Sequence, residues 1–92
     1  MIEKKQIIKE EEKAVLVGVI QKEHTEEQVD EYLAELAFLA ETAGAMAIKI
    51  FKQRLQHPDS KTFVGKGKLD EIRQYVAAKD IDVVIFDDEL TG

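Results

Sequence analysis

Glycines and lysines lie together between two apolar stretches of this 92-residue chain. Thr62-Phe63-Val64 leads into Gly65-Lys66-Gly67-Lys68, and a helical pattern follows. A glycine-rich turn between a strand and a helix can leave backbone N–H groups at the helix N-terminus, where they bind anions such as phosphate. Four residues are therefore candidates for binding a nucleotide or a phosphate: Gly65, Lys66, Gly67 and Lys68.

The same turn also allows a purely structural interpretation. Gly65 and Gly67 permit a tight connection from a strand to a helix without any ligand. The run does not match a Walker A loop, because Leu69 stands where Ser or Thr would follow the lysine. It does not match a dinucleotide fingerprint either, because the third glycine would fall at Asp70. The sequence leaves both interpretations open.

Three consecutive acids, Asp87-Asp88-Glu89, follow the apolar run Val83–Phe86. Carboxylates at the end of a strand can hold Mg²⁺ beside a bound phosphate, which makes Asp87 and Asp88 weak metal candidates. Alternatively, the acids form ion pairs with Lys66 and Lys68, the more common situation for exposed charges. We expect no firm metal site and no catalytic residue, since the chain has two histidines, one serine and no cysteine.

Charge is unevenly distributed along the chain, whose net charge is −6. Residues 23–41 contain seven acids and no Lys or Arg, whereas residues 49–68 contain six Lys or Arg and one acid. A basic stretch can contact phosphates, so we predict four RNA-facing residues: Lys49, Lys52, Arg54 and Lys61. The overall acidity argues against tight RNA binding by this domain alone.

The periodicity of apolar residues predicts the elements that position these side chains. Ala14–Ile20 is a β-branched run typical of a strand buried on both faces. Thr25 and Gln28 form a capping box at the start of a helix that ends at Gly44. A second helix is predicted at Lys68–Lys79, and further strands at Ala45–Leu55, Thr62–Val64 and Val83–Phe86.

The predicted element order is β-α-β-β-α-β, a small α/β domain with a mostly parallel four-stranded sheet and two main helices. Residues 14–92 form this domain, and residues 1–13 form a charged N-terminal extension. Right-handed crossovers place the loops at 21–25, 65–68 and 87–92 on one edge of the sheet. Without a signal peptide or an apolar stretch long enough for a membrane, we expect a cytoplasmic location.

Four elements occur in a characteristic order: Thr42-Ala43-Gly44, Pro58, Thr62–Lys68 and Val84–Leu90. Together they resemble the N-terminal region of the HflX family of GTPases, and the resemblance spans residues 14–91. It implies that the chain is part of a multidomain translational GTPase that binds the large ribosomal subunit. It also implies that a helical segment and a G domain, which holds GTP and Mg²⁺, lie outside this chain.

The resemblance leaves three functions open for this domain. In the family, the N-terminal region is linked to contact with ribosomal RNA, to restraint of the G domain and, in some members, to ATP binding. We expect an accessory domain without GTPase activity of its own, because the chain lacks the GTP-binding motifs. The second hypothesis is a nucleotide-binding domain that uses Gly65–Lys68 and Asp87 or Asp88. The third is a structural domain onto which the helical and G domains dock.

Overall fold

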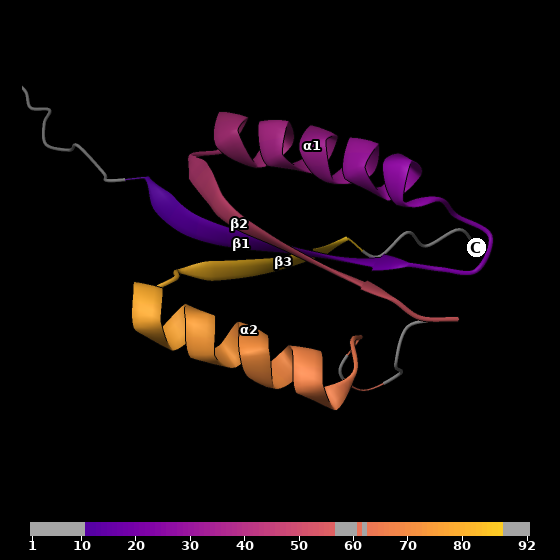
Figure 1. The fold of residues 1–92 in the computed structure, drawn as a ribbon. Helices are drawn as coiled ribbons and strands as arrows, with labels where there is room; N and C mark the ends of the chain where they lie inside the picture. Colours follow the sequence, from indigo (N-terminus) through magenta and orange to yellow (C-terminus); the bar gives the residue numbers. More distant parts are fainter. Residues whose placement is uncertain (1–10, 57–60, 62, 88–92) are drawn as a thin grey trace, which may run out of the picture.

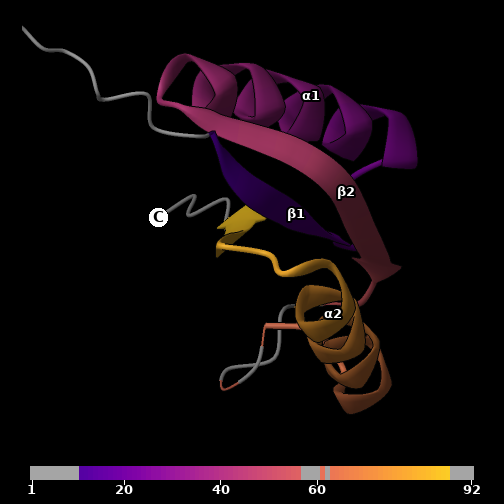
Figure 2. The same ribbon diagram turned by 90° about the vertical axis from the view of Figure 1, so that its left-hand side faces the viewer.

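The computed structural model describes residues 11–56, 61 and 63–87, which form three layers. One helix covers each face of a central sheet, as Figure 1 and the perpendicular view in Figure 2 show. The described part of the chain contains no helix long and apolar enough to cross a membrane. The elements follow in the order β1 (Glu12–Ile20), α1 (Glu26–Thr42), β2 (Ala45–Arg54), α2 (Lys66–Lys79) and β3 (Val83–Asp87).

The three strands are parallel and lie in the order β2-β1-β3. β1 is central, which explains why Ala14–Ile20 is apolar and buried throughout. The carboxyl ends of the three strands lie at one edge of the sheet, called here the carboxyl edge. The loop after β1, the start of α2 and the end of β3 all lie there, which confirms the predicted positions of residues 21–25 and 65–68. Of the predicted loop at 87–92, residues 88–92 lie outside the described residues. From β2, the chain crosses β1 to reach β3 on its other side.

The prediction of a fourth strand at Thr62–Val64 is wrong, because the sheet formed by the described residues has three strands. Phe63 has a φ of 70°, which lies in the left-handed region and is incompatible with an extended strand. Thr62 lies outside the described residues. Phe63 forms an isolated bridge and no strand. Val64 is fully buried, so the apolar pattern at this position reflects packing against the core.

Both predicted ends of α1 are confirmed. The backbone N–H of Gln28 donates to Thr25 Oγ1 at 3.1 Å, and the backbone N–H of Thr25 donates to Gln28 Oε1 at 2.9 Å. This reciprocal capping satisfies two N–H groups at the helix start. Gly44 follows the helix with a φ of 97°, the left-handed conformation typical of a glycine that ends a helix.

An apolar layer lies on each face of the sheet. Side chains on β1 alternate between the two layers, so one continuous apolar run serves both helices. The buried residues on the α2 side are Val15, Val17, Val19, Phe51, Val64 and Ile72. Those on the α1 side include Leu16, Ile20, Val29 and Leu33. With both faces covered, the ends and edges of the sheet are the places left for other molecules.

Candidate functional site

The start of α2 brings the glycines and lysines of the predicted anion site to the carboxyl edge. Gly65 is the N-cap residue, with φ −66° and ψ 162°, and Lys66-Gly67-Lys68 form the first turn of the helix. The backbone N–H of Gly65 donates to Oε1 of Gln53, near the end of β2, at 2.8 Å. This hydrogen bond fixes the start of α2 against the end of the neighbouring strand.

The two glycines do not supply a left-handed turn. Neither Gly65 nor Gly67 has a positive φ, whereas Phe63 does. An added Cβ at Gly67 would meet no atom within 4 Å, and one at Gly65 would first meet the side chain of Gln53 at 3.4 Å. The fold therefore does not need a glycine at position 67. That Gly65 and Gly67 bind a ligand stays a prediction.

The two lysines of this turn have different surroundings. Lys68 Nζ lies 3.3 Å from Glu71 Oε1 and 6.0 Å from the centre of the Phe51 ring. Its charge is therefore partly compensated within the protein. Lys66 is exposed at the first position of α2, where the helix dipole adds partial positive charge. Of the two lysines, Lys66 is the better placed to meet an anion.

The predicted basic strip does not form one surface. Lys49 and Lys52 are three residues apart on β2, so their side chains project from opposite faces of the sheet. On the α2 side, Lys49 Nζ lies 5.5 Å from the ring centre of Phe51 and 5.9 Å from that of Tyr75. Lys52 lies on the α1 side. One RNA molecule on a single face of the sheet could not contact both lysines.

Lys52 links β2 to the start of α1 by two ion pairs. Its Nζ lies 2.6 Å from Asp30 Oδ1 and 2.8 Å from Glu26 Oε2. The hydrogen bond to Asp30, followed by that to Glu26, raises the pKa of Lys52 above its ordinary value. Because two carboxylates compensate its charge, Lys52 is poorly suited to bind phosphate.

We expect Lys52→Met, which keeps most of the apolar stem, to lower the free energy of unfolding by about 0.5–1 kcal/mol at neutral pH. The pKa of Lys52 is raised in the folded state. The ion pairs therefore stabilise fully below the ordinary lysine pKa of 10.5, and this stabilisation disappears as the pH rises through the folded value. Urea denaturation of both proteins at pH 7 and at several alkaline pH values measures this. If the free energies of unfolding of the unmodified protein and of Lys52→Met differed by the same amount at every alkaline pH, the ion-pair assignment would be contradicted.

A second group of cations meets at the carboxyl edge. Lys22 follows β1, and Arg54 ends the neighbouring strand β2. Together with Leu55 and Gln56 they line a surface pocket of about 290 Å³. Sequence reasoning selected Arg54 but missed Lys22. Lys22 could have been selected because it lies two residues after the predicted first strand. Loops at the carboxyl ends of parallel strands commonly bind ligands.

The remaining predicted site residues are only partly described. Asp87 ends β3 and lies opposite Gly18 of the central strand, at the carboxyl edge, whereas Asp88 lies outside the described residues. Lys61 is exposed. Within residues 11–56, 61 and 63–87, no three His, Cys, Asp or Glu side chains gather as metal ligands. Mg²⁺ binding by Asp87 and Asp88 stays a prediction.

The sequence is similar to one group of known proteins. Residues 30–92 match the family model described as GTP-binding GTPase N-terminal. A protein named GTPase HflX from Flavobacterium psychrophilum is 46% identical over 80 residues, which are 87% of this chain and 19% of that protein. A protein of the same name from Caldanaerobacter subterraneus is 38% identical over 95% of this chain and 19% of that protein. The one from Escherichia coli is 36% identical over 87% of this chain and 18% of that protein. The chain thus spans about a fifth of the length of these curated relatives.

Proposed function

Because this chain belongs to the GTP-binding GTPase N-terminal family of the HflX GTPases, we propose that it is an accessory domain of a ribosome-associated GTPase. In this proposal the domain contacts RNA of the large ribosomal subunit and controls a G domain outside this chain. That G domain binds GTP and Mg²⁺ and hydrolyses GTP in the cytoplasm, and the domain described here does not hydrolyse GTP itself.

The carboxyl-edge cations carry the RNA part of this proposal. Lys22, Arg54 and Lys66 come from three separate segments of the sequence and are all exposed. Among the described residues, none of the three forms an ion pair, in contrast to Lys52 and Lys68. Uncompensated cations attract the phosphates of RNA and release counterions when they bind them. Three such residues suit a modest, salt-dependent contact that supplements binding by other parts of the protein.

The test is ribosome binding by the full-length protein with Lys22→Gln, Arg54→Gln and Lys66→Gln combined. We expect weaker binding to the large subunit, because up to three phosphate contacts are lost. The slope of log K against log salt concentration should become shallower by roughly 2 units, at about 0.7–0.9 per contact. Sedimentation of ribosomal subunits with the protein at several salt concentrations measures both quantities.

A matched control removes three positive charges from other places. Lys49→Gln, Lys52→Gln and Lys79→Gln change the net charge equally but leave the carboxyl-edge cations in place. We expect this control to keep the slope of the unmodified protein. If the control lost slope and the carboxyl-edge variant did not, the RNA contact would lie elsewhere on the domain.

Nucleotide binding by the domain itself is the second candidate function. The carboxyl ends of β1 and β3 form the switch point of this sheet, the place where parallel α/β sheets commonly bind nucleotides. In this alternative the Gly65–Lys68 turn holds phosphate, and Asp87 or Asp88 holds Mg²⁺. Calorimetric titration of this chain with ATP and with GTP tests it. Binding that requires Mg²⁺ and is lost in Lys66→Gln and in Asp87→Asn would favour this function over RNA contact.

A further inference from the structure

The outer edge of β2 carries apolar side chains that other elements do not cover. β2 is an edge strand of 10 residues, so the backbone groups on its outer side have no strand partner among the described residues. Met46, Ile48 and Ile50 are 41%, 36% and 42% exposed. A long apolar edge of this kind attracts further strands.

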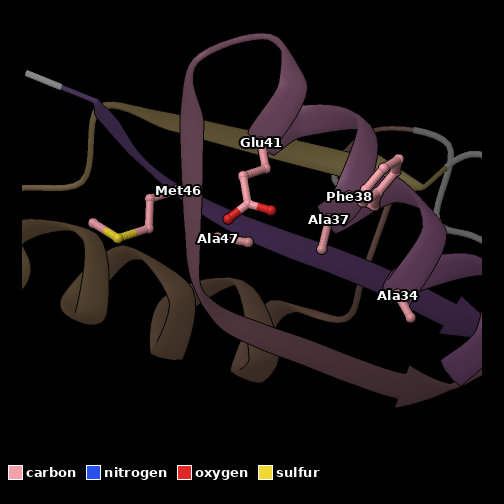
Figure 3. Close-up of a pocket in the computed structure, with 6 residues that line it drawn as sticks. All are labelled: Ala34, Ala37, Phe38, Glu41, Met46 and Ala47. Carbon is pink, nitrogen blue, oxygen red and sulfur yellow. The ribbon is translucent and has the colours of Figure 1, made fainter. Parts of the chain in front are cut away.

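A groove of about 290 Å³ lies beside this edge, between α1 and the start of β2. It is lined by Ala34, Ala37, Phe38, Glu41, Met46 and Ala47. Figure 3 shows Glu41 extending its carboxylate from α1 towards Ala47. The residue Phe38 is 63% exposed, although it is among the largest apolar residues of the helix. The groove is therefore mostly apolar with one carboxylate at its side.

The helix that forms one wall of the groove is strongly acidic. Residues 26–41 contain six acids and no Lys or Arg. Lys52 compensates two of them, Glu26 and Asp30, at the opposite end of the helix from Glu41. No cation among the described residues pairs with Glu41. The edge and the groove together therefore suit a partner that brings positive charge as well as apolar side chains.

The same charges disfavour a second copy of the chain as the partner. A symmetric contact through β2 would bring two acidic helices close together. β2 also contains a bulge: Ala14 pairs with Ala47 but Val15 pairs with Lys49, which leaves Ile48 as the additional residue. The bulge disturbs regular pairing at Ile48 with any added strand, so the acidic helices and not the bulge disfavour a second copy.

We propose that the outer edge of β2 and the adjoining groove bind an extended cationic polypeptide segment as an additional strand. Its backbone pairs with the free side of β2, the arrangement known as β-augmentation. Its apolar side chains pack against Ile50 and the ring of Phe38 on the α1 side, and one Lys or Arg pairs with Glu41. This surface lies on the β2 edge strand and is separate from the carboxyl edge, so its occupancy is independent of contact with RNA.

The first experiment uses a synthetic ten-residue peptide whose odd positions alternate isoleucine with lysine and whose even positions are threonine, so that isoleucine and lysine face the same side of the sheet as α1. Its control is the same peptide with glutamate in place of lysine. Binding is followed by NMR titration and by amide hydrogen exchange. We expect the lysine peptide to protect the outward-facing amides between residues 46 and 50, and the glutamate peptide to bind at least about tenfold more weakly at low salt.

Variants of this chain test the groove directly. Phe38→Ala should weaken binding of the lysine peptide about fivefold. Leu39→Ala, the neighbouring residue, is 55% exposed but does not line the groove, and it should change the affinity less than about twofold. Glu41→Lys should weaken binding at low salt, whereas Glu23→Lys, with the same change of charge in the loop after β1, should not.

Several outcomes would overturn the proposal. Equal binding of the two peptides would remove the charge argument, and protection of β3 amides in place of β2 amides would move the site. Sedimentation of the chain alone as a dimer that Phe38→Ala dissociates would assign the edge to a second copy. Outward-facing β2 amides that were already protected in the free monomer would show that another part of the same chain covers them.

Discussion

Leu33→Ala is expected to lower the free energy of unfolding by about 3 kcal/mol. Leu33 is 1% exposed and packs with Leu16, Ile20 and Val29 in the layer between α1 and the sheet. Truncation removes buried methyl groups and leaves a cavity that rigid neighbours on β1 cannot fill. A domain of this size has a total stability of roughly 5–14 kcal/mol, so the variant loses a large part of it.

Leu39→Ala is the matched control for this prediction. Leu39 lies on the same helix but is 55% exposed, and we expect a change of less than about 0.5 kcal/mol. Urea denaturation followed by circular dichroism measures both variants under identical conditions. Similar losses at the two positions would mean that the buried face of α1 is wrongly assigned.

Gly18→Val is expected to lower the free energy of unfolding by about 2–3 kcal/mol through overpacking. Gly18 lies in β1 under α1, and an added Cβ would lie 2.9 Å from Cδ1 and 3.2 Å from Cδ2 of Leu33. These distances are shorter than carbon atoms tolerate without bonding, so α1 must move away from the sheet or Leu33 must leave its rotamer. Thermal unfolding and urea denaturation of the variant measure the loss.

The double variant of Gly18→Ala and Leu33→Ala shows whether Leu33 is the neighbour that limits the space at Gly18. Gly18→Ala adds a methyl group where Leu33→Ala removes an isopropyl group, so the two changes compensate in part. We expect the double variant to be more stable than the sum of the single effects predicts, by about 1 kcal/mol. Strictly additive effects would show that strain at Gly18 arises from another neighbour.

Elements decided by nearby residues were predictable from the sequence. The capping box of Thr25 and Gln28 and the left-handed Gly44 fix the ends of α1, and the unbroken apolar run of β1 requires cover on both faces. The predicted strand at Thr62–Val64 failed for the opposite reason. Phe63 has a positive φ and packs against Phe86, with the two ring centres 5.2 Å apart. The sequence gives no sign of this conformation, because a bulky residue such as phenylalanine seldom adopts a positive φ.

The candidate site was predictable only in part. The separation of Lys49 and Lys52 by three positions on a strand already places them on opposite faces, so the division of the basic strip could have been derived from the two-residue period. The pairing of Lys52 with α1 could not, because it depends on how the helix lies across the sheet. The meeting of Lys22 and Arg54 likewise requires β1 and β2 to be neighbours, which periodicity does not reveal.

The central position of β1 has a kinetic consequence for folding. Glu12 pairs with Ala45, at the start of the strand that follows α1. On its other side, the backbone N–H of Lys13 donates to Asp82, 69 residues away in the sequence. Closing a loop about twice as long costs roughly 0.6 kcal/mol more in chain entropy, so the β1-α1-β2 unit is favoured to form first. Synthesis proceeds in the same order, and the nascent chain can fold this unit before the residues of β3 have been added.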